Sequence, residues 1–170
     1  GEVTEIFKLP LEKQVSALRA SSNPQAQFLW ACFRDLFHYS ATHLQSIAEK
    51  TSDVDLCMRW GYGWLQGPFE QWQAWGIETV NASLLEDIQN KKTMVQVALP
   101  SWASSAETRF YDKAGSFSPA TKTFLQRNTR PFYARQLMGE RLPFESAPEG
   151  KVIFENDGLV MWTLDQSQAI

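Results

Sequence analysis

Few residues in this chain are of the types that carry out acid–base or metal chemistry. His38 and His43 are the only histidines among 170 residues, and they lie five positions apart on a predicted helix. At about 3.6 residues per turn, this spacing separates them by about 140° around the helix axis, whereas two histidines that share a metal from one helix are four apart. The sequence therefore favours surface or hydrogen-bonded histidines and predicts no metal site, with a general-base role for His38 as the alternative.

The carboxylates that stand out lie near predicted helix starts. Asp53 and Asp55 are two positions apart where one helix begins, and Glu70 follows Pro68 in the first turn of the next. Carboxylates are stabilised there by the positive end of the helix dipole, which explains these residues without catalysis. A paired-carboxylate acid–base site is the alternative.

The two cysteines predict no reactive centre. Cys32 and Cys57 each lie in an apolar stretch, without a CxxC partner or a nearby histidine. Buried and packed thiols are the expected state, because two cysteines cannot build a disulfide framework.

Three glycines raise the question of nucleotide binding. Gly61, Gly63 and Gly67 have the spacing G-x-G-x-x-x-G and follow a predicted helix. A dinucleotide-binding loop requires a strand before the glycines and a helix after them, so that backbone amides meet the pyrophosphate. We therefore interpret this segment as a tight turn between helices, packed beneath aromatic side chains.

Tryptophan is unusually dense in the same region. Of the seven tryptophans, Trp60, Trp64, Trp72 and Trp75 fall within sixteen positions. Buried tryptophans remove much apolar surface from water, so core packing is the first interpretation. The alternative is an aromatic wall for an apolar ligand such as an acyl chain.

The elements that would position these residues are mostly helical. Apolar residues recur at three and four positions, and proline, asparagine and glycine mark helix ends. Towards the C-terminus four prolines interrupt the pattern, and alternating residues then flank Asn156-Asp157-Gly158, a hairpin signal. The predicted elements are helices over 10–20, 24–50, about 51–60, 68–75, 77–89 and 101–107, a small hairpin at 110–117, a connector over 119–150 and a terminal β-hairpin over 151–170.

Composition excludes several classes of partner. The net charge is -3 and hydrophobic residues make up 44% of the chain, so there is no basic excess for nucleic acid and no sign of disorder. No apolar run is long enough to span a membrane, and the first residues lack the pattern of a signal peptide. We expect a cytoplasmic protein.

Three neighbouring motifs together resemble a known family. The segment Asp53 to Trp64, followed by Gly67-Pro68-Phe69-Glu70 and by Trp72 to Gly76, is similar to the C-terminal helical module of 3-hydroxyacyl-CoA dehydrogenases. The resemblance covers residues 10–118 and is best to the second such module of proteins fused to an enoyl-CoA hydratase. The chain departs from the family at Gln73, where the family has aspartate, and at Trp75, where it has isoleucine.

The resemblance implies an all-α fold like the C-terminal domain of 6-phosphogluconate dehydrogenase over residues 1–118, with 151–170 as the start of a crotonase-like domain. The parent protein would oxidise (3S)-hydroxyacyl-CoA to 3-oxoacyl-CoA in fatty-acid β-oxidation. Its NAD would bind to an upstream nucleotide-binding domain, outside this chain. The resemblance assigns no catalytic, cofactor-binding or metal-binding residue here, so the isolated chain is predicted to be inactive. The alternative is a freestanding, aromatic-rich module that binds acyl ligands or a partner.

Two sets of residues follow from the motifs. Residues of the first set would face the substrate cleft or a domain junction: Trp60, Trp64, Pro68, Phe69 and Trp72. Residues of the second set would maintain the local structure: Asp55, Met58, Arg59, Gly61, Gly63, Gly67 and Gly76.

Overall fold

A computed structural model describes residues 1–105, 107–126, 151–156 and 159–163. The chain divides into two units, residues 1–134 and 135–170, and each is described by itself. The described part of the first unit consists of α1 (Glu2–Ile6), α2 (Leu11–Ala20), α3 (Pro24–Ile47), α4 (Thr51–Tyr62), α5 (Pro68–Ala74), α6 (Ile77–Gln89), α7 (Ser101–Ser104), and an antiparallel pair, β1 (Ser116–Ser118) and β2 (Thr123–Leu125). The mostly helical fold predicted from the sequence is confirmed.

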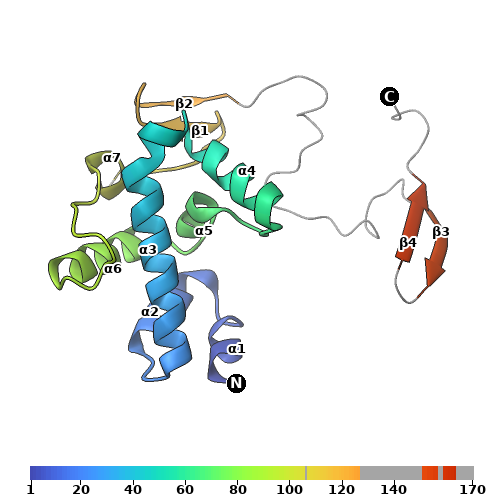
Figure 1. The fold of residues 1–170 in the computed structure, drawn as a ribbon, viewed down its shortest axis with the longest axis horizontal. Coiled ribbons are helices and arrows are strands. Elements are labelled where there is room, and N and C mark those ends of the chain that lie inside the picture. The colour runs from blue at the N-terminus through green and yellow to red at the C-terminus, as the bar shows by residue number, and fades with distance from the viewer. Residues whose placement is uncertain (106, 127–150, 157–158, 164–170) are drawn as a thin grey trace. The chain divides into compact units, whose positions relative to one another are not determined.

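The long helix α3 organises the first unit. Its start is set locally, because the Asn23 side chain accepts a hydrogen bond from the Gln25 amide at 2.9 Å and Pro24 occupies the first turn. In Figure 1 α3 runs through the middle of this unit, with α4 and α5 to one side of it and α6 and α7 to the other. The short helices α1 and α2 lie near its N-terminal end. Helix α3 thus offers one face to α4 and α5, where the family-like motifs lie.

The core is built around two of the clustered tryptophans. Trp72 of α5 and Trp75, which caps the end of α5, are fully buried, and Phe37 of α3 stacks on the Trp72 ring with 5.4 Å between centroids. Each indole N–H has a partner: Trp72 donates to Asn81 at 3.0 Å, and Trp75 donates to Gln14 at 2.9 Å. These bonds offset the cost of burying a polar N–H and tie α5 to α6 and α2.

Three local predictions differ from the structure. Helix α4 continues through Gly61 to Tyr62 and ends at Gly63, whose left-handed φ of 69° favours glycine. The segment from Phe110 to Phe117 makes a bridge and a turn, but the regular pairing joins β1, which overlaps the end of this segment, to β2, which lies in the stretch expected to be a connector. Helix α1 was not predicted, because five residues give too short a periodic signal.

The prediction of buried cysteines was wrong. Cys32 and Cys57 are both free and exposed. Residues that are adjacent in a helix point to different sides of it, so apolar neighbours in sequence do not imply burial. Only the side of the helix on which apolar residues recur every three or four positions enters the core.

The second unit contains the predicted terminal hairpin. Strands β3 (Lys151–Asn156) and β4 (Leu159–Thr163) pair in an antiparallel manner, with Asn156 opposite Leu159. The irregular tail predicted between the hairpin and the helical module falls mostly on residues 127–150, outside the described part of the chain. Among the described residues, no helix combines the length and apolar character needed to cross a membrane.

Candidate functional site

The C-terminal end of α4 and the turn after it form an exposed aromatic face. Trp60 is 61% exposed, Tyr62 72%, Trp64 38% and Leu65 66%. Exposed large apolar side chains that are close together in sequence are candidates for an interaction site. We call these four residues the aromatic face.

The structure separates the predicted cleft residues into two groups. Trp60 and Trp64 belong to the aromatic face, whereas Phe69 and Trp72 are fully buried and Pro68 is also buried. Core packing therefore explains Trp72 but not Trp60 or Trp64. Trp64 lies beyond the end of α4, so its spacing of four from Trp60 does not place the pair on one helical face.

An apolar groove lies beside the aromatic face, between α3 and α4. Its volume is about 460 Å³, and it is lined mainly by Leu36, Tyr39 and Ile47 of α3, by Val54, Cys57 and Met58 of α4, and by Pro68. Cys57 and Trp60 are three residues apart on α4, so the groove and the aromatic face occupy neighbouring parts of one helix surface.

The turn that carries the aromatic face is anchored by Asp55. This carboxylate is fully buried, and it accepts hydrogen bonds from the amides of Phe69 and Glu70, both at 2.9 Å. Asp55 therefore caps α5. The prediction that it serves the start of its own helix was wrong, because at α4 that role falls to Asp53, which accepts from the Lys50 amide at 3.2 Å.

A second carboxylate closes the same turn. Glu70 accepts from the Gly67 amide at 2.8 Å and from Arg59 of α4 at 3.1 Å. Both side chains of the ion pair are mostly buried, so the pair is shielded from water and fixes α5 against α4. Arg59, predicted as part of the structural motif, thus links the two helices.

The environment of Asp55 changes its proton affinity. Burial raises the pKa of Asp55 to about 7, although hydrogen bonds from the Tyr111 hydroxyl and the Phe69 amide act in the opposite direction. Tyr111 donates to Asp55 at 2.5 Å, and burial also raises the pKa of Tyr111 well above its ordinary value. Tyr111 lies 56 residues from Asp55 in sequence, and spacing within the motif gave no signal of this contact.

Gln73 holds the segment that brings Tyr111 to Asp55. Its side-chain oxygen accepts from the amides of Phe110 and Tyr111 at 2.8 and 3.0 Å, and its amide nitrogen donates to the Tyr111 carbonyl at 3.1 Å. Aspartate, which the resembled motif has at this position, carries no side-chain donor and could not make the donation to the Tyr111 carbonyl. The departure at Gln73 therefore coincides with hydrogen bonds from its side chain to the backbone of Phe110 and Tyr111.

Substituting Gln73 tests this clamp. We expect Gln73→Glu to lower the free energy of unfolding by about 1–2 kcal/mol, because the donor is lost and a carboxylate oxygen faces the Tyr111 carbonyl. Gln45→Glu is the matched control, since Gln45 is exposed on α3, and we expect it to stay within about 0.5 kcal/mol. Urea unfolding followed by circular dichroism measures both. Equal midpoints for the two variants would show that the clamp contributes nothing.

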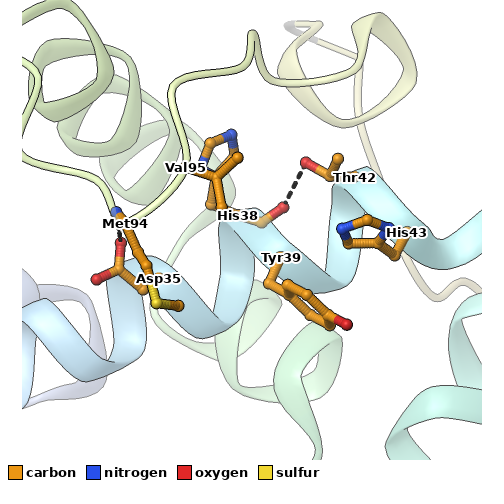
Figure 2. A pocket seen from close by; sticks show the side chains of 7 residues that line it. All are labelled: Asp35, His38, Tyr39, Thr42, His43, Met94 and Val95. Carbon is orange, nitrogen blue, oxygen red and sulfur yellow. Dashed lines mark hydrogen bonds between the residues drawn. The ribbon is translucent and has the colours of Figure 1, made fainter.

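The two histidines do not form a common site. His38 is buried, its Nε2 lies 3.0 Å from the Val97 carbonyl oxygen, and burial lowers its pKa. His43 packs beside Tyr39, with 4.4 Å between ring centroids. Figure 2 shows both among the seven residues that line a small pocket, together with Met94 and Val95. Its volume is only about 10 Å³, about enough for one water molecule. The prediction of hydrogen-bonded or surface histidines is confirmed. Among the described residues, no group of His, Cys, Asp or Glu could hold a metal ion.

Comparison with known proteins gives one partial similarity. The chain is 36% identical over 75 residues to a probable 3-hydroxyacyl-CoA dehydrogenase of Bacillus subtilis (strain 168). The matched stretch is 44% of this chain but 9% of that protein, so the similarity covers only a small part of the length of the Bacillus protein. No family model and no solved structure matches the chain.

Proposed function

We propose that this chain is a non-catalytic helical module of a 3-hydroxyacyl-CoA dehydrogenase, in which it packs against a neighbouring domain and helps to wall the acyl-CoA cleft. The observation that carries the proposal is the rigidly held aromatic face. Trp60 and Trp64 are exposed, while the turn between them and α5 is fixed by Asp55, Glu70 and Arg59. Tryptophan and tyrosine are the side chains that anchor interfaces most often, and a fixed backbone reduces the entropy lost on binding.

The similarity to the Bacillus protein supports the class of parent enzyme. That protein is described as a probable 3-hydroxyacyl-CoA dehydrogenase, and the similarity covers 9% of its length. Most of such a parent would lie outside the matched stretch. The parent would use NAD bound to a nucleotide-binding domain upstream, and we assign no catalytic or cofactor-binding residue to this chain.

We also propose that residues 151–170 begin a crotonase-like enoyl-CoA hydratase domain fused downstream. The hairpin of β3 and β4 is a separate two-stranded sheet. Two strands alone are marginally stable in water, so such a hairpin gains from joining a larger sheet. Reading the parental frame on both sides tests this part: a strand, a glycine loop and a helix upstream with a crotonase-like domain downstream are expected, and any other pair of neighbours would contradict the fusion.

An activity measurement tests the non-catalytic role. We expect the purified chain, mixed with acetoacetyl-CoA and NADH, to leave NADH absorbance unchanged. The physical reason is that the polar residues of its motifs are used for structure: Asp55, Glu70 and Gln73 accept hydrogen bonds from backbone amides. A full-length 3-hydroxyacyl-CoA dehydrogenase is the positive control. Saturable oxidation of NADH by the chain alone would refute the proposal.

The groove between α3 and α4 favours a second candidate, a module that binds an acyl ligand by itself. Its volume of about 460 Å³ lies in the range of small-molecule sites, and its lining is largely apolar. Titrating an acyl-CoA against tryptophan fluorescence separates the two candidates, because Trp60 lies one helical turn from Cys57, which lines the groove on α4. Tight, saturable quenching that is abolished by Cys57→Arg would support the binder. Absence of quenching supports the packing module.

A further inference from the structure

A second pocket lies at the junction of α2, α3 and α6, and it shares no lining residue with the apolar groove. Its volume is about 740 Å³, within the range of small-molecule sites, and polar and charged side chains from all three helices line much of it. Three of these side chains are cations: Arg19 of α2, Arg34 of α3 and Lys92, which follows α6. Segments that are distant in sequence thus bring three positive charges to one cavity.

A buried carboxylate orders these cations. Asp87 of α6 is 1% exposed, and it accepts from Arg19 at 3.1 Å on Oδ1 and from the Trp30 indole N–H at 2.8 Å on Oδ2. The Nη1 atom of Arg34 and the Nζ atom of Lys92 each lie 3.8 Å from an oxygen of Asp87. That distance allows an ionic attraction but is too long for a hydrogen bond. Asp87 therefore gathers all three cations without using up their donors.

The cations retain N–H groups that no side chain or carbonyl in the described part of the chain accepts. Arg19 donates only through Nη2, which it shares between Glu86, at 3.0 Å, and the buried carboxylate. Arg34 donates through Nε and Nη2 to Asp35, at 3.2 and 2.9 Å, so Nη1 remains. An arginine carries five N–H donors and a lysine three, as a general inventory, so the donors at this pocket outnumber their acceptors.

A buried hydroxyl adds an unpaired donor to the same pocket. Ser83 of α6 lines it and is only 5% exposed, and within the described part of the chain its hydroxyl makes no hydrogen bond. The large majority of buried hydroxyls in proteins are hydrogen-bonded. An unpaired one in the wall of a polar cavity therefore indicates a partner from outside the chain.

We propose that this pocket binds the phosphate group of a small phosphorylated ligand. A phosphate group offers three acceptor oxygens and about two negative charges, so it can accept from guanidinium, ammonium and hydroxyl donors together. A carboxylate has only two oxygens and one charge. The site goes beyond the packing role proposed above and does not depend on it.

The carboxylates at this site set how the phosphate is attracted. Asp35, Glu86 and Asp87 offset the three positive charges, so the cations are held in place before a ligand arrives. Attraction then comes from directed, charged N–H donors rather than from an excess of positive charge. The volume of the pocket also leaves room for an organic part attached to the phosphate.

Calorimetric titration of the whole chain tests the site with three probes: inorganic phosphate, adenosine monophosphate and adenosine. We expect saturable binding of the first two and none of adenosine. Equal affinities for phosphate and adenosine monophosphate would support recognition of the phosphate alone, whereas tighter binding of the nucleotide would support a larger phosphorylated ligand. No saturable binding of either, or adenosine bound as tightly as its monophosphate, would overturn the proposal.

Two neighbouring lysines provide a matched pair of variants. We expect Lys92→Gln to weaken phosphate binding about tenfold, because a charged donor is lost from the pocket. Lys91→Gln removes the same charge from an exposed residue that does not line the pocket, and its affinity should equal that of the wild type. Equal weakening in both variants would mean that phosphate senses only the overall charge, which contradicts a built site.

Ser83→Ala tests the unpaired hydroxyl. We expect it to weaken phosphate binding about threefold and to leave the urea midpoint unchanged, because the hydroxyl has no partner within the described chain to lose. Wild-type affinity in this variant would remove Ser83 from the site and leave the buried hydroxyl without the role assigned to it. The titration of the wild-type chain decides whether the pocket binds phosphate even if a variant does not fold.

Discussion

Replacing Gly67 with alanine is expected to lower the free energy of unfolding by about 3 kcal/mol. A Cβ at this position would lie 2.3 Å from the Cα of Asp55 and 2.4 Å from its Cβ. These atoms belong to the middle of α4 and to the root of a buried side chain, so they cannot move aside cheaply. The substitution would force the turn away from Asp55 and loosen the hydrogen bonds that cap α5 at Phe69 and Glu70.

Gly61→Ala is the matched control within the same motif. A Cβ on Gly61 meets nothing within 4 Å, and the residue lies inside α4. Alanine is a better helix former than glycine, so we expect this variant to be more stable than the wild type by about 0.5–1 kcal/mol. Urea unfolding of both variants measures the difference. A Gly67→Ala chain that unfolds at the wild-type midpoint would show that the contact with Asp55 is not rigid.

The three glycines show what the sequence could and could not reveal. Their spacing predicted a turn, and the turn is present, yet the three glycines do not share one reason for being glycine. Gly63 ends α4 with a left-handed φ, which glycine adopts most easily, whereas Gly67 has an ordinary φ of -80° and is needed because another backbone passes close to it. Gly61 has neither reason in this chain.

The helices were predictable because their signals are local. For α3, α5 and α6, the apolar spacing and the neighbouring asparagine, proline or glycine give nearly the observed bounds. The anchor of the site was not predictable in this way. Asp55 accepts hydrogen bonds from two residues of α5, 14 and 15 positions away, and from Tyr111, 56 positions away. Gln73 accepts hydrogen bonds from residues 37 and 38 positions away. Such partners depend on how helices pack, which a single sequence does not encode at any fixed spacing.

The same limit applies to the exposure of side chains. The density of tryptophan in one region indicated burial for all four, but only Trp72 and Trp75 enter the core. Trp60 lies on the face of α4 that α3 and α5 leave open, and the helix ends before Trp64. Which face of α4 is covered is decided by the docking of α5, and that docking is fixed by Asp55 and by the Arg59–Glu70 ion pair.

A pair of tryptophan variants separates the core from the aromatic face. We expect Trp72→Ala to lower the free energy of unfolding by about 3–5 kcal/mol, because it empties a fully buried site between Phe37, Phe69 and Phe110 and leaves the Asn81 oxygen without its indole donor. Domains of ordinary size have only about 5–15 kcal/mol in total, so the variant should be close to unfolding.

Trp60→Ala removes as large a side chain from the surface, where 61% of it is exposed, and we expect a loss of no more than about 0.5 kcal/mol. Thermal and urea unfolding of both variants measures the contrast. If Trp60→Ala cost as much as Trp72→Ala, the end of α4 would be part of the core and the aromatic face would not exist as a free surface. If it costs almost nothing, the fold does not require Trp60, and a large aromatic side chain kept in water on the last turns of α4 is explained best by what it contacts outside this chain.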